Sequence, residues 1–331
     1  MNRALASALL SLGVLAAHPI KTHALDDSSC SSGLQGDVRT YLSIDDPEAD
    51  DTRATDGKVR LRGWLYTPTG TPPADGFPIL VFNHGSGEEP SSRCVLANYF
   101  VAKKNFVLFV PVRRGHTGST GEYYKDYAER QADAFCGGDP GFCGSSGHDS
   151  VVDYYKMAYL QVQRQDVVEA VKYVKTQPAV NSSKITVMGH SYGAMVSLFF
   201  NMLDNTPDTK AVISISAGAQ SWDSNDYAQD YLKDAVDQAQ HPIYFLQPKN
   251  DVTTKPTGTL AKQAADKPMR FQAAIFSDVP DSLIQPCPRL DSDGDTLSCG
   301  DVAHSQFVSD KDQVEKWGAT VVDFLDRLGA K

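Results

Sequence analysis

Residues 184–202 read KITVMGHSYGAMVSLFFNM, and this stretch decides the fold. It opens with a short apolar run typical of a buried strand, and the apolar residues near its end repeat at the spacing of a helix. Between them, Gly189, Ser191 and Gly193 fit the G-x-S-x-G pattern, in which a serine occupies a sharp turn from strand to helix. Such a turn needs small residues on both sides and projects the serine hydroxyl above the carboxyl edge of the sheet. Ser191 is therefore the candidate nucleophile, and the alternative is a tight turn whose serine only caps the helix.

Short apolar runs recur along the chain without alternating with polar residues. They span residues 79–82, 107–110, 185–188, 211–215, 243–246 and 271–275. Strands that are apolar on both faces are typical of a buried, mostly parallel sheet, because half-exposed antiparallel strands alternate. Amphipathic stretches with helical spacing lie between and after these runs, and the clearest covers residues 314–328. This succession predicts a single α/β domain with a doubly wound sheet.

The first residues have the features of a signal peptide. Arg3 precedes an apolar run at residues 4–17, which is 14 residues long and too short to cross a bilayer as a helix. We expect cleavage after Ala24, with Ala17 as the alternative, so that residues 1–24 are removed on export to the periplasm or the cell exterior. No later apolar stretch is long enough to span a membrane.

The remaining chain divides into an acidic lead-in at residues 25–57 and a catalytic domain at residues 58–331. We expect a first strand within residues 38–44, paired with a second at residues 59–66. The lead-in contributes to an acidic composition, with 31 lysines and arginines against 41 aspartates and glutamates and a net charge of −10. A chain of this charge has no basic field for phosphate backbones, so nucleic acid is excluded as a partner. We expect a small-molecule partner, and nothing in the sequence indicates an oligomeric state.

Residues 121–160 form an insertion that follows the second parallel strand and carries eight aromatic residues. We interpret it as a wall of the substrate pocket, because aromatic side chains supply apolar area with a polar tip. The alternative is a surface loop that a disulfide pins in place. Fewer than 30 residues separate Ile215 from Ile243, which leaves no room for a large cap domain there.

The chain has an even number of cysteines, six, and in an exported protein this favours disulfides. The local spacing favours three pairings, Cys136 with Cys143, Cys287 with Cys299 and, as the remainder, Cys30 with Cys94. A metal site is disfavoured because the chain has no C-x-x-C pair and no histidine at ligand spacing. The acidic stretch at residues 291–295 resembles the start of a calcium loop, yet Thr296 and Val302 stand where glycine and glutamate are expected. We therefore expect no metal ion.

A serine hydroxyl needs a base to become a nucleophile, and the base needs an acid to orient it. In α/β hydrolases the acid and then the histidine follow the serine along the chain, and only His241 and His304 follow Ser191. His241 opens a strand and so lies at the wrong edge of the sheet. His304, which we expect in a loop before the final helix, is the candidate base.

Asp251 is the candidate acid. It follows the apolar run at residues 243–246 through a short turn, which places it at the carboxyl edge of the sheet. Asp278 and Asp281 are the reserves for this role, and the alternative for Asp251 is an ordinary turn aspartate.

Two backbone amides are candidates to hold the oxyanion that forms when Ser191 attacks a carbonyl. One belongs to Tyr192, directly after the nucleophile, and the other to Ser86 in the stretch NHGSG at residues 83–87. We expect His84 to hold this loop rather than to react. The stretch RRGHTG at residues 113–118 ends the next strand at the same edge, and we interpret it as a turn that shapes the loops.

Five features together carry a resemblance to a known family: the 83–87 loop, Arg114-Gly115-His116, Gly189-His190-Ser191-Tyr192-Gly193-Ala194, Asp251 and His304. Over residues 58–329 the chain resembles the α/β hydrolases and is most similar to their dienelactone-hydrolase-like group. This resemblance implies a mostly parallel eight-stranded sheet flanked by helices, a Ser-Asp-His triad, and hydrolysis of an ester or related acyl bond without a cofactor. Dienelactone hydrolases use a cysteine nucleophile, and this chain has Ser191 instead, so dienelactone is not the expected substrate.

The sequence thus predicts a secreted serine hydrolase that cleaves a carboxylic ester through an acyl-enzyme intermediate. A serine peptidase or amidase of the same fold is the first alternative, because the same groups can open amides. A catalytically silent hydrolase fold that only binds is the second, although the presence of candidates for all three triad positions argues against it.

Overall fold

The computed structural model describes most of the chain from Ser28 onward. The described residues are 28–30, 33–43, 58–87, 89–138, 140–204, 206–267, 271–290 and 296–331. The signal peptide expected at residues 1–24, much of the acidic lead-in and the acidic stretch at residues 291–295 lie outside them, so these three expectations stay predictions.

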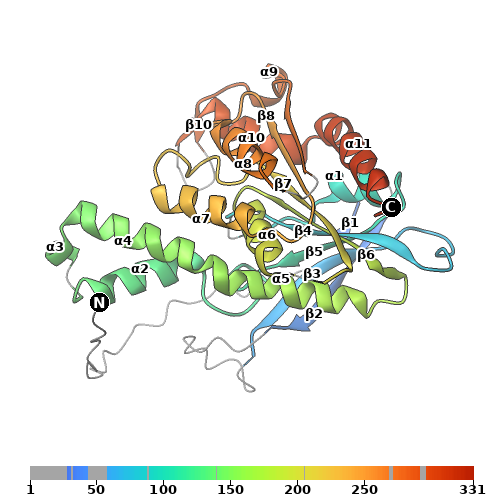
Figure 1. Ribbon diagram of the computed structural model, residues 1–331, viewed down its shortest axis with the longest axis horizontal. Helices are drawn as coiled ribbons and strands as arrows, with labels where there is room; N and C mark the ends of the chain where they lie inside the picture. Colours follow the sequence, from blue (N-terminus) through green and yellow to red (C-terminus); the bar gives the residue numbers. More distant parts are fainter. Residues whose placement is uncertain are drawn as a thin grey trace.

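One large sheet forms the centre of the molecule, with strand order β1-β2-β3-β5-β4-β6-β7-β8-β9 (Figure 1). Its strands are β1 (Ser28–Ser29), β2 (Gln35–Leu42), β3 (Arg60–Tyr66), β4 (Phe77–Asn83), β5 (Val107–Val112), β6 (Val180–His190), β7 (Thr209–Ile215), β8 (Ile243–Pro248) and β9 (Phe271–Phe276). The pairings from β5 to β9 are parallel, and those from β1 to β5 are antiparallel. The prediction of a mostly parallel eight-stranded sheet is confirmed, with the two-residue β1 added at one edge.

Helices connect and cover these strands. They are α1 (Cys94–Leu96), the π-helical turn η1 (Ala97–Val101), α2 (Tyr124–Phe135), α3 (Pro140–Cys143), α4 (Ser145–Ala158), α5 (Leu160–Lys175), α6 (Tyr192–Leu203), α7 (Asp226–Asp237), α8 (Lys255–Ala265), α9 (Asp281–Ile284), α10 (Cys299–Ser309) and α11 (Lys311–Arg327). A short separate ribbon pairs β10 (Arg289–Leu290) with β11 (Thr296–Leu297). Among the described helices, none is long and apolar enough to cross a membrane.

The two faces of the sheet are buried under different helices, which explains the continuous apolar runs. In β4, Ile79 and Val81 belong to the core that α5, α6, α7 and α8 cover. The alternate residues Leu80 and Phe82 belong to the opposite core, with η1, α10 and α11. Because both faces of the sheet are covered, a polar side chain at any position of such a strand would be buried. The strands are therefore mostly apolar along these runs instead of alternating with polar residues.

The last strand departs from this pattern. The run at residues 271–275 was expected to be buried, but Phe271 and Ile275 in β9 are 37% and 47% exposed. That expectation is wrong because β9 is the edge strand and pairs only with β8, so its side chains have neighbours on one side.

The insertion at residues 121–160 folds as a pair of helices that we call the helical hairpin, α2 and α4. Figure 1 shows it extending from the sheet, with α3 at its far end. The Cys136–Cys143 disulfide closes that end, and Ala128, Ala132 and Val152 form a small core between the helices. The segment is helical rather than a loop, although the disulfide is present and tyrosines of the segment pack on one another, as the alternative expected. That the insertion walls the substrate pocket stays a prediction.

A buried ion pair ties the lead-in, β5 and α5 together. Arg114 follows β5, and its guanidinium lies 2.7 Å from the carboxylate of Asp166 on α5, with both side chains almost fully buried. Asp166 also accepts hydrogen bonds from the backbone N–H of Arg114 and from the hydroxyl of Ser43, which follows β2. A buried charge is tolerated only when it is paired and hydrogen-bonded in this way.

The substitution Asp166→Asn tests this pair. It leaves the Arg114 charge buried without a carboxylate, and we expect the free energy of unfolding in urea to fall by about 3–5 kcal/mol. Asp230→Asn is the control, because Asp230 forms an exposed pair with Lys233 at 3.4 Å and should change stability by less than about 1 kcal/mol. Equal effects of the two substitutions would contradict the role given to Asp166.

Candidate active site

Ser191 occupies a strained turn between β6 and α6. Its φ is 56° and its ψ is −123°, a backbone conformation that residues other than glycine rarely adopt. Its backbone N–H donates to the carbonyl of Ile215 at the end of β7, and the residue is 7% exposed. The expected turn from strand to helix is present, and a strained serine held at the carboxyl edge of a sheet is typical of a nucleophile.

The glycines around Ser191 are required by backbone contacts. A Cβ atom added at Gly189 would lie 2.2 Å from the carbonyl oxygen of Gly193. A Cβ atom added at Gly193 would lie 2.2 Å from the carbonyl oxygens of both Asn83 and His84. The turn therefore packs backbone against backbone on the 83–87 loop, and a side chain at either position would separate them.

His304 and Asp251 form a buried hydrogen-bonded pair. Nδ1 of His304 lies 2.8 Å from Oδ1 of Asp251, and the side chains are 3% and 0% exposed. Since the carboxylate accepts, Nδ1 carries the proton and Nε2 presents its lone pair. Nε2 is buried and has no hydrogen-bond partner among the described residues. A histidine in this state can accept a proton at Nε2.

The prediction that His304 lies in a loop is wrong, because it sits in the middle of α10. Its backbone carbonyl accepts a hydrogen bond of 3.1 Å from Nε2 of His190, and the two imidazole rings are 4.4 Å apart. Burial, and then the neighbouring His304, lower the pKa of His190 well below its usual value, so His190 is neutral at physiological pH. His190 directly precedes Ser191, and this contact brings α10 to the turn at residues 189–193, which we call the nucleophile turn after the role expected for Ser191.

Asp251 is oriented by its own turn. Its Oδ1 accepts from the backbone N–H of Val252 at 2.7 Å, and its Oδ2 accepts from the side chain of Gln247 at 3.0 Å. The reserve aspartates Asp278 and Asp281 are exposed, and His304 bonds to Asp251 instead.

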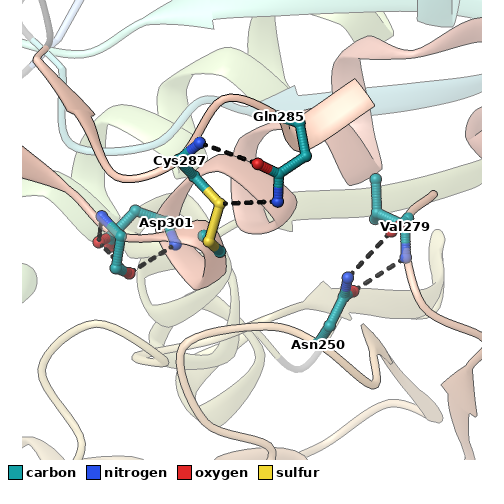
Figure 2. The surroundings of a disulfide bond; sticks show 7 residues. Asn250, Val279, Gln285, Cys287 and Asp301 are labelled. Carbon is teal, nitrogen blue, oxygen red and sulfur yellow. Dashed lines mark hydrogen bonds between the residues drawn. A yellow bond between two sulfur atoms is a disulfide. The ribbon is translucent and has the colours of Figure 1, made fainter. Parts of the chain in front are cut away.

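The start of α10 is fixed against the turn that carries Asp251. A Cβ atom at Gly300 would lie 2.9 Å from the Cα atom of Val252. Figure 2 shows the Cys287–Cys299 disulfide at this point, with Gln285 bonded to the backbone N–H and sulfur of Cys287. The packing of Gly300 sets the distance between the first turn of α10 and the turn of Asp251, while the disulfide ties the same turn of α10 to Cys287.

Further bonds support the same region. In Figure 2 the side chain of Asn250 holds both the N–H and the carbonyl of Val279, each at 2.9 Å. Ser298 and Asp301 form a reciprocal capping box at the start of α10. The three disulfides of the structure join Cys30 to Cys94, Cys136 to Cys143 and Cys287 to Cys299, the pairings that the spacing favours.

Both candidate oxyanion donors neighbour Ser191. Tyr192 begins α6, and a backbone N–H in the first turn of a helix has no acceptor within the helix. Ser86 lies in the loop after β4, and a Cβ atom at the preceding Gly85 would be 3.7 Å from Cβ of Ser191. Their role as donors to a substrate oxygen stays a prediction.

The 83–87 loop is supported by side chains whose role the sequence alone did not indicate. Arg113 is fully buried and donates hydrogen bonds to the carbonyls of His84 and Gly85. The hydroxyl of Tyr123 donates to the carbonyl of Ser86 at 2.7 Å. His84 bonds within this network, in agreement with the structural role expected for it. One sequence feature could have indicated this role: Arg113 and Arg114 directly follow an apolar strand. Arginines are rarely buried, so two of them at the end of a buried strand point to specific partners there.

No group of three or more histidine, cysteine or acidic side chains that could hold a metal ion occurs in the described part of the chain.

Comparisons with known proteins agree with this architecture. The model of the prolyl oligopeptidase family matches residues 151–274, less than half of the chain, a segment that includes Ser191 and Asp251 and ends before His304. Among solved structures, the chain is similar to the acylaminoacyl peptidase of Pyrococcus horikoshii, with a TM-score of 0.53 and 12% identity over 88% of this chain and 41% of that chain. The protein has the α/β-hydrolase fold.

Two further solved structures show the same likeness. One is DcsB in complex with its substrate analogue, with a TM-score of 0.53 and 13% identity over 89% of this chain and 100% of that chain. The other is a puromycin-hydrolyzing peptidase of Mycobacterium tuberculosis, with a TM-score of 0.50 and 16% identity over 82% of this chain and 38% of that chain. The chain thus spans less than half the length of both peptidases. A comparison with curated protein sequences finds no match.

The substitution Gly193→Ala tests the backbone contact at the nucleophile turn. The added methyl group would meet two carbonyl oxygens at 2.2 Å, and we expect the free energy of unfolding to fall by at least about 3 kcal/mol. Gly258→Ala is the matched control, because Gly258 lies in α8 and a Cβ there meets nothing within 4 Å. That change should stabilise the protein by up to about 1 kcal/mol through helix propensity. A Gly193→Ala protein as stable as the wild type would contradict the contact.

Proposed function

We propose that the protein is a serine hydrolase that cleaves a carboxylic ester through an acyl-enzyme intermediate at Ser191. The observation that carries this proposal is the buried His304–Asp251 pair on α10, a helix that contacts the turn at Ser191. Nε2 of His304 is buried and has no hydrogen-bond partner among the described residues. The strained backbone of Ser191 supports the same assignment.

The reaction then follows from the groups of this chain and water. The hydroxyl oxygen of Ser191 attacks the ester carbonyl carbon while Nε2 of His304 accepts its proton, and Asp251 stabilises the imidazolium that forms. The carbonyl oxygen becomes an oxyanion, which the amides of Ser86 and Tyr192 hold. His304 returns the proton to the leaving alcohol, and a water activated by the same histidine hydrolyses the acyl-enzyme.

An ester is the substrate class that these groups support most directly. An alkoxide leaves a tetrahedral intermediate more readily than an amide nitrogen does, so a triad able to open amides also opens esters. The aromatic residues at the base of the helical hairpin lie beside the proposed donors, since Tyr124 stacks on Tyr192 with ring centroids 4.5 Å apart. This supports the interpretation that the insertion walls the acyl or alcohol pocket.

A serine peptidase or amidase is the second candidate. It is favoured by the match to the prolyl oligopeptidase family and by the likeness to the acylaminoacyl and puromycin-hydrolyzing peptidases. The resemblance to the dienelactone-hydrolase-like group stays a prediction.

We also propose that the enzyme acts outside the cytoplasm, in the periplasm or the medium. Three disulfides support this, because such bonds persist in oxidising compartments, and so does the signal peptide expected at residues 1–24.

Turnover of a panel of short-chain aryl esters tests the nucleophile. We expect the wild-type protein to hydrolyse at least part of the panel and Ser191→Ala to lose at least about a hundredfold in kcat, because no other group forms the acyl-enzyme. Ser309→Ala, at the exposed end of α10, serves as the control and should match the wild type. Aminoacyl anilides measured beside the esters decide between the two candidate functions. Wild-type protein inactive on both classes would overturn the proposal and favour the binding-protein alternative.

The substitution Asp251→Asn tests the acid. The asparagine would favour the wrong tautomer of His304, and we expect kcat to fall by about a thousandfold or more with little change in fold. The matched control is Asp278→Asn, which changes an exposed reserve aspartate and should leave kcat within about twofold of the wild type. The reverse ranking would assign the acid to Asp278.

A further inference from the structure

Arg113 is a fully buried arginine directly after β5, in contact with the residue that follows Ser191. Its Nη1 donates to the carbonyl of His84 at 2.6 Å, and its Nη2 donates to the carbonyl of Gly85 at 2.7 Å. Its guanidinium also lies over the ring of Tyr192, 5.4 Å from the centroid. One side chain thus contacts both the 83–87 loop and the residue after Ser191, the two places from which the oxyanion donors are proposed to come.

Arg114, the next residue, has a structural role in a similarly buried environment. Arg114 is equally buried and is neutralised by the carboxylate of Asp166. Arg113 forms no ion pair in the described part of the chain, and its two short hydrogen bonds, at 2.6 and 2.7 Å, go to backbone carbonyls. The carboxylate of Asp166 acts on it only through a longer-range electrostatic interaction. Burial lowers the pKa of Arg113 to about 10, so it still carries its charge at neutral pH. A buried charge without a carboxylate destabilises the fold, which indicates that the charge serves another purpose.

The peptide that Arg113 binds is the one that contains the proposed donor. The carbonyl of Gly85 and the N–H of Ser86 belong to a single peptide unit, which is planar and trans, so the two groups point in opposite directions. Two donors hold the carbonyl, Nη2 of Arg113 at 2.7 Å and Nδ1 of His84 at 2.9 Å. Fixing the oxygen fixes the direction of the N–H, and a cation on the oxygen makes the N–H a stronger donor.

The tautomer of His84 is consistent with this arrangement. Its Nδ1 lies 2.9 Å from the carbonyl of Gly85, which can only accept, so Nδ1 carries the proton, although Nη2 of Arg113 also lies 3.4 Å from it. Nε2 is then free to accept from the backbone N–H of Arg113 at 3.4 Å. Burial, followed by the charge of Arg113, lowers the pKa of His84 well below its usual value and keeps the ring neutral.

The next peptide and the second donor are held from the helical hairpin. Tyr123 donates to the carbonyl of Ser86 at 2.7 Å, and Tyr124 stacks on Tyr192 at an interplanar angle of 27°. A Cβ atom at Gly115 would lie 2.3 Å from the Cα of Tyr123, so the turn after Arg113 and the start of the hairpin are in direct contact. Both sides of the proposed oxyanion site therefore share one rigid support.

We infer that Arg113 is a positioning residue of the oxyanion hole. It holds the Ser86 amide towards the substrate oxygen through the Gly85 carbonyl, and its charge stabilises the negative charge that develops on that oxygen. This inference rests on the proposed serine hydrolase function.

The substitutions Arg113→Met and Arg113→Lys test it in the full chain. Methionine fills space without charge or donors, whereas lysine keeps the charge and loses the bidentate geometry. Removal of an oxyanion donor costs a factor of about 10²–10³ in kcat, and loss of its support should cost about 10–100-fold, with KM within about threefold of the wild type. We expect Arg113→Lys to recover part of the loss. Arg114→Lys is the matched control, and its kcat should stay within about threefold while its stability falls.

A transition-state analogue separates this role from a structural one. Ser191 adds to an aryl trifluoromethyl ketone to give a tetrahedral adduct whose oxyanion occupies the proposed hole. We expect Ki for the ketone to rise by the same factor by which kcat/KM falls in each Arg113 variant, and to change little in Arg114→Lys. If Arg113→Met does not fold, Arg113→Lys alone decides. Arg113 variants that bind the ketone as tightly as the wild type, or lose activity only in step with Arg114→Lys, would overturn the inference.

Labelling by a fluorophosphonate distinguishes the two ways in which the experiment can fail. Labelled Ser191 in the wild type supports the serine hydrolase function, and unchanged ketone affinity in the Arg113 variants then overturns the inference alone. Wild-type protein that is neither labelled nor active on esters or amides overturns the proposed function, and the role of Arg113 with it.

Discussion

The structure of the site depends on one backbone contact, the close approach of Gly193 to the carbonyls of Asn83 and His84. At this point a Cβ atom would be 2.2 Å from both oxygens, so the first turn of α6 rests directly on the loop after β4. The contact sets the separation between Ser191 and the amide of Ser86. Around it, Asn83 bonds to Ser197 on α6 at 2.8 Å, and the hydroxyl of Ser197 bonds to the carbonyl of Gly193 at 2.8 Å. Ser191, the proposed nucleophile, and the proposed donor therefore share one rigid frame, as preorganised stabilisation requires.

Much of this arrangement could be predicted because it is local in sequence. The turn at Ser191 lies within a few residues of its strand and helix, and the disulfide spacings at Cys136 and Cys287 are short. What could not be predicted depends on packing between distant segments. One error was nevertheless local, because α10 begins at the capping box of Ser298 and Asp301, three residues apart, and this signal could have predicted that His304 lies in a helix. The exposure of β9 follows from its place at the edge of the sheet, which no property of its own residues indicates.

The two consecutive arginines show why a motif alone does not assign roles. From the sequence, both belong to a turn that shapes loops, and both are fully buried. Their side chains leave the chain in different directions at the end of β5, so Arg114 meets the carboxylate of Asp166, whereas Arg113 meets the carbonyls of the 83–87 loop. The partners come from segments about 50 residues after and 30 residues before the pair, and only the fold brings them together. Only the tertiary structure therefore distinguishes Arg114, whose charge a carboxylate neutralises, from Arg113, whose charge is proposed to act on the oxyanion.

The site concentrates several features that each disfavour folding: the positive φ of Ser191, the buried cation of Arg113 and the unpartnered Nε2 of His304. Strain and unpaired polar groups of this kind cost about 1–3 kcal/mol each and persist only where the surroundings hold them. Here the surroundings are a sheet covered on both faces, the Cys287–Cys299 disulfide at the start of α10, and the helical hairpin rooted at Tyr123. In the proposed mechanism two of these features are relieved when the reaction proceeds, because the oxyanion meets the amide that Arg113 supports and Nε2 gains its missing partner, whereas the backbone of Ser191 stays strained throughout. If these groups act as proposed, the free-energy cost of the two unsatisfied groups is offset in the transition state, which favours catalysis over tight ground-state binding.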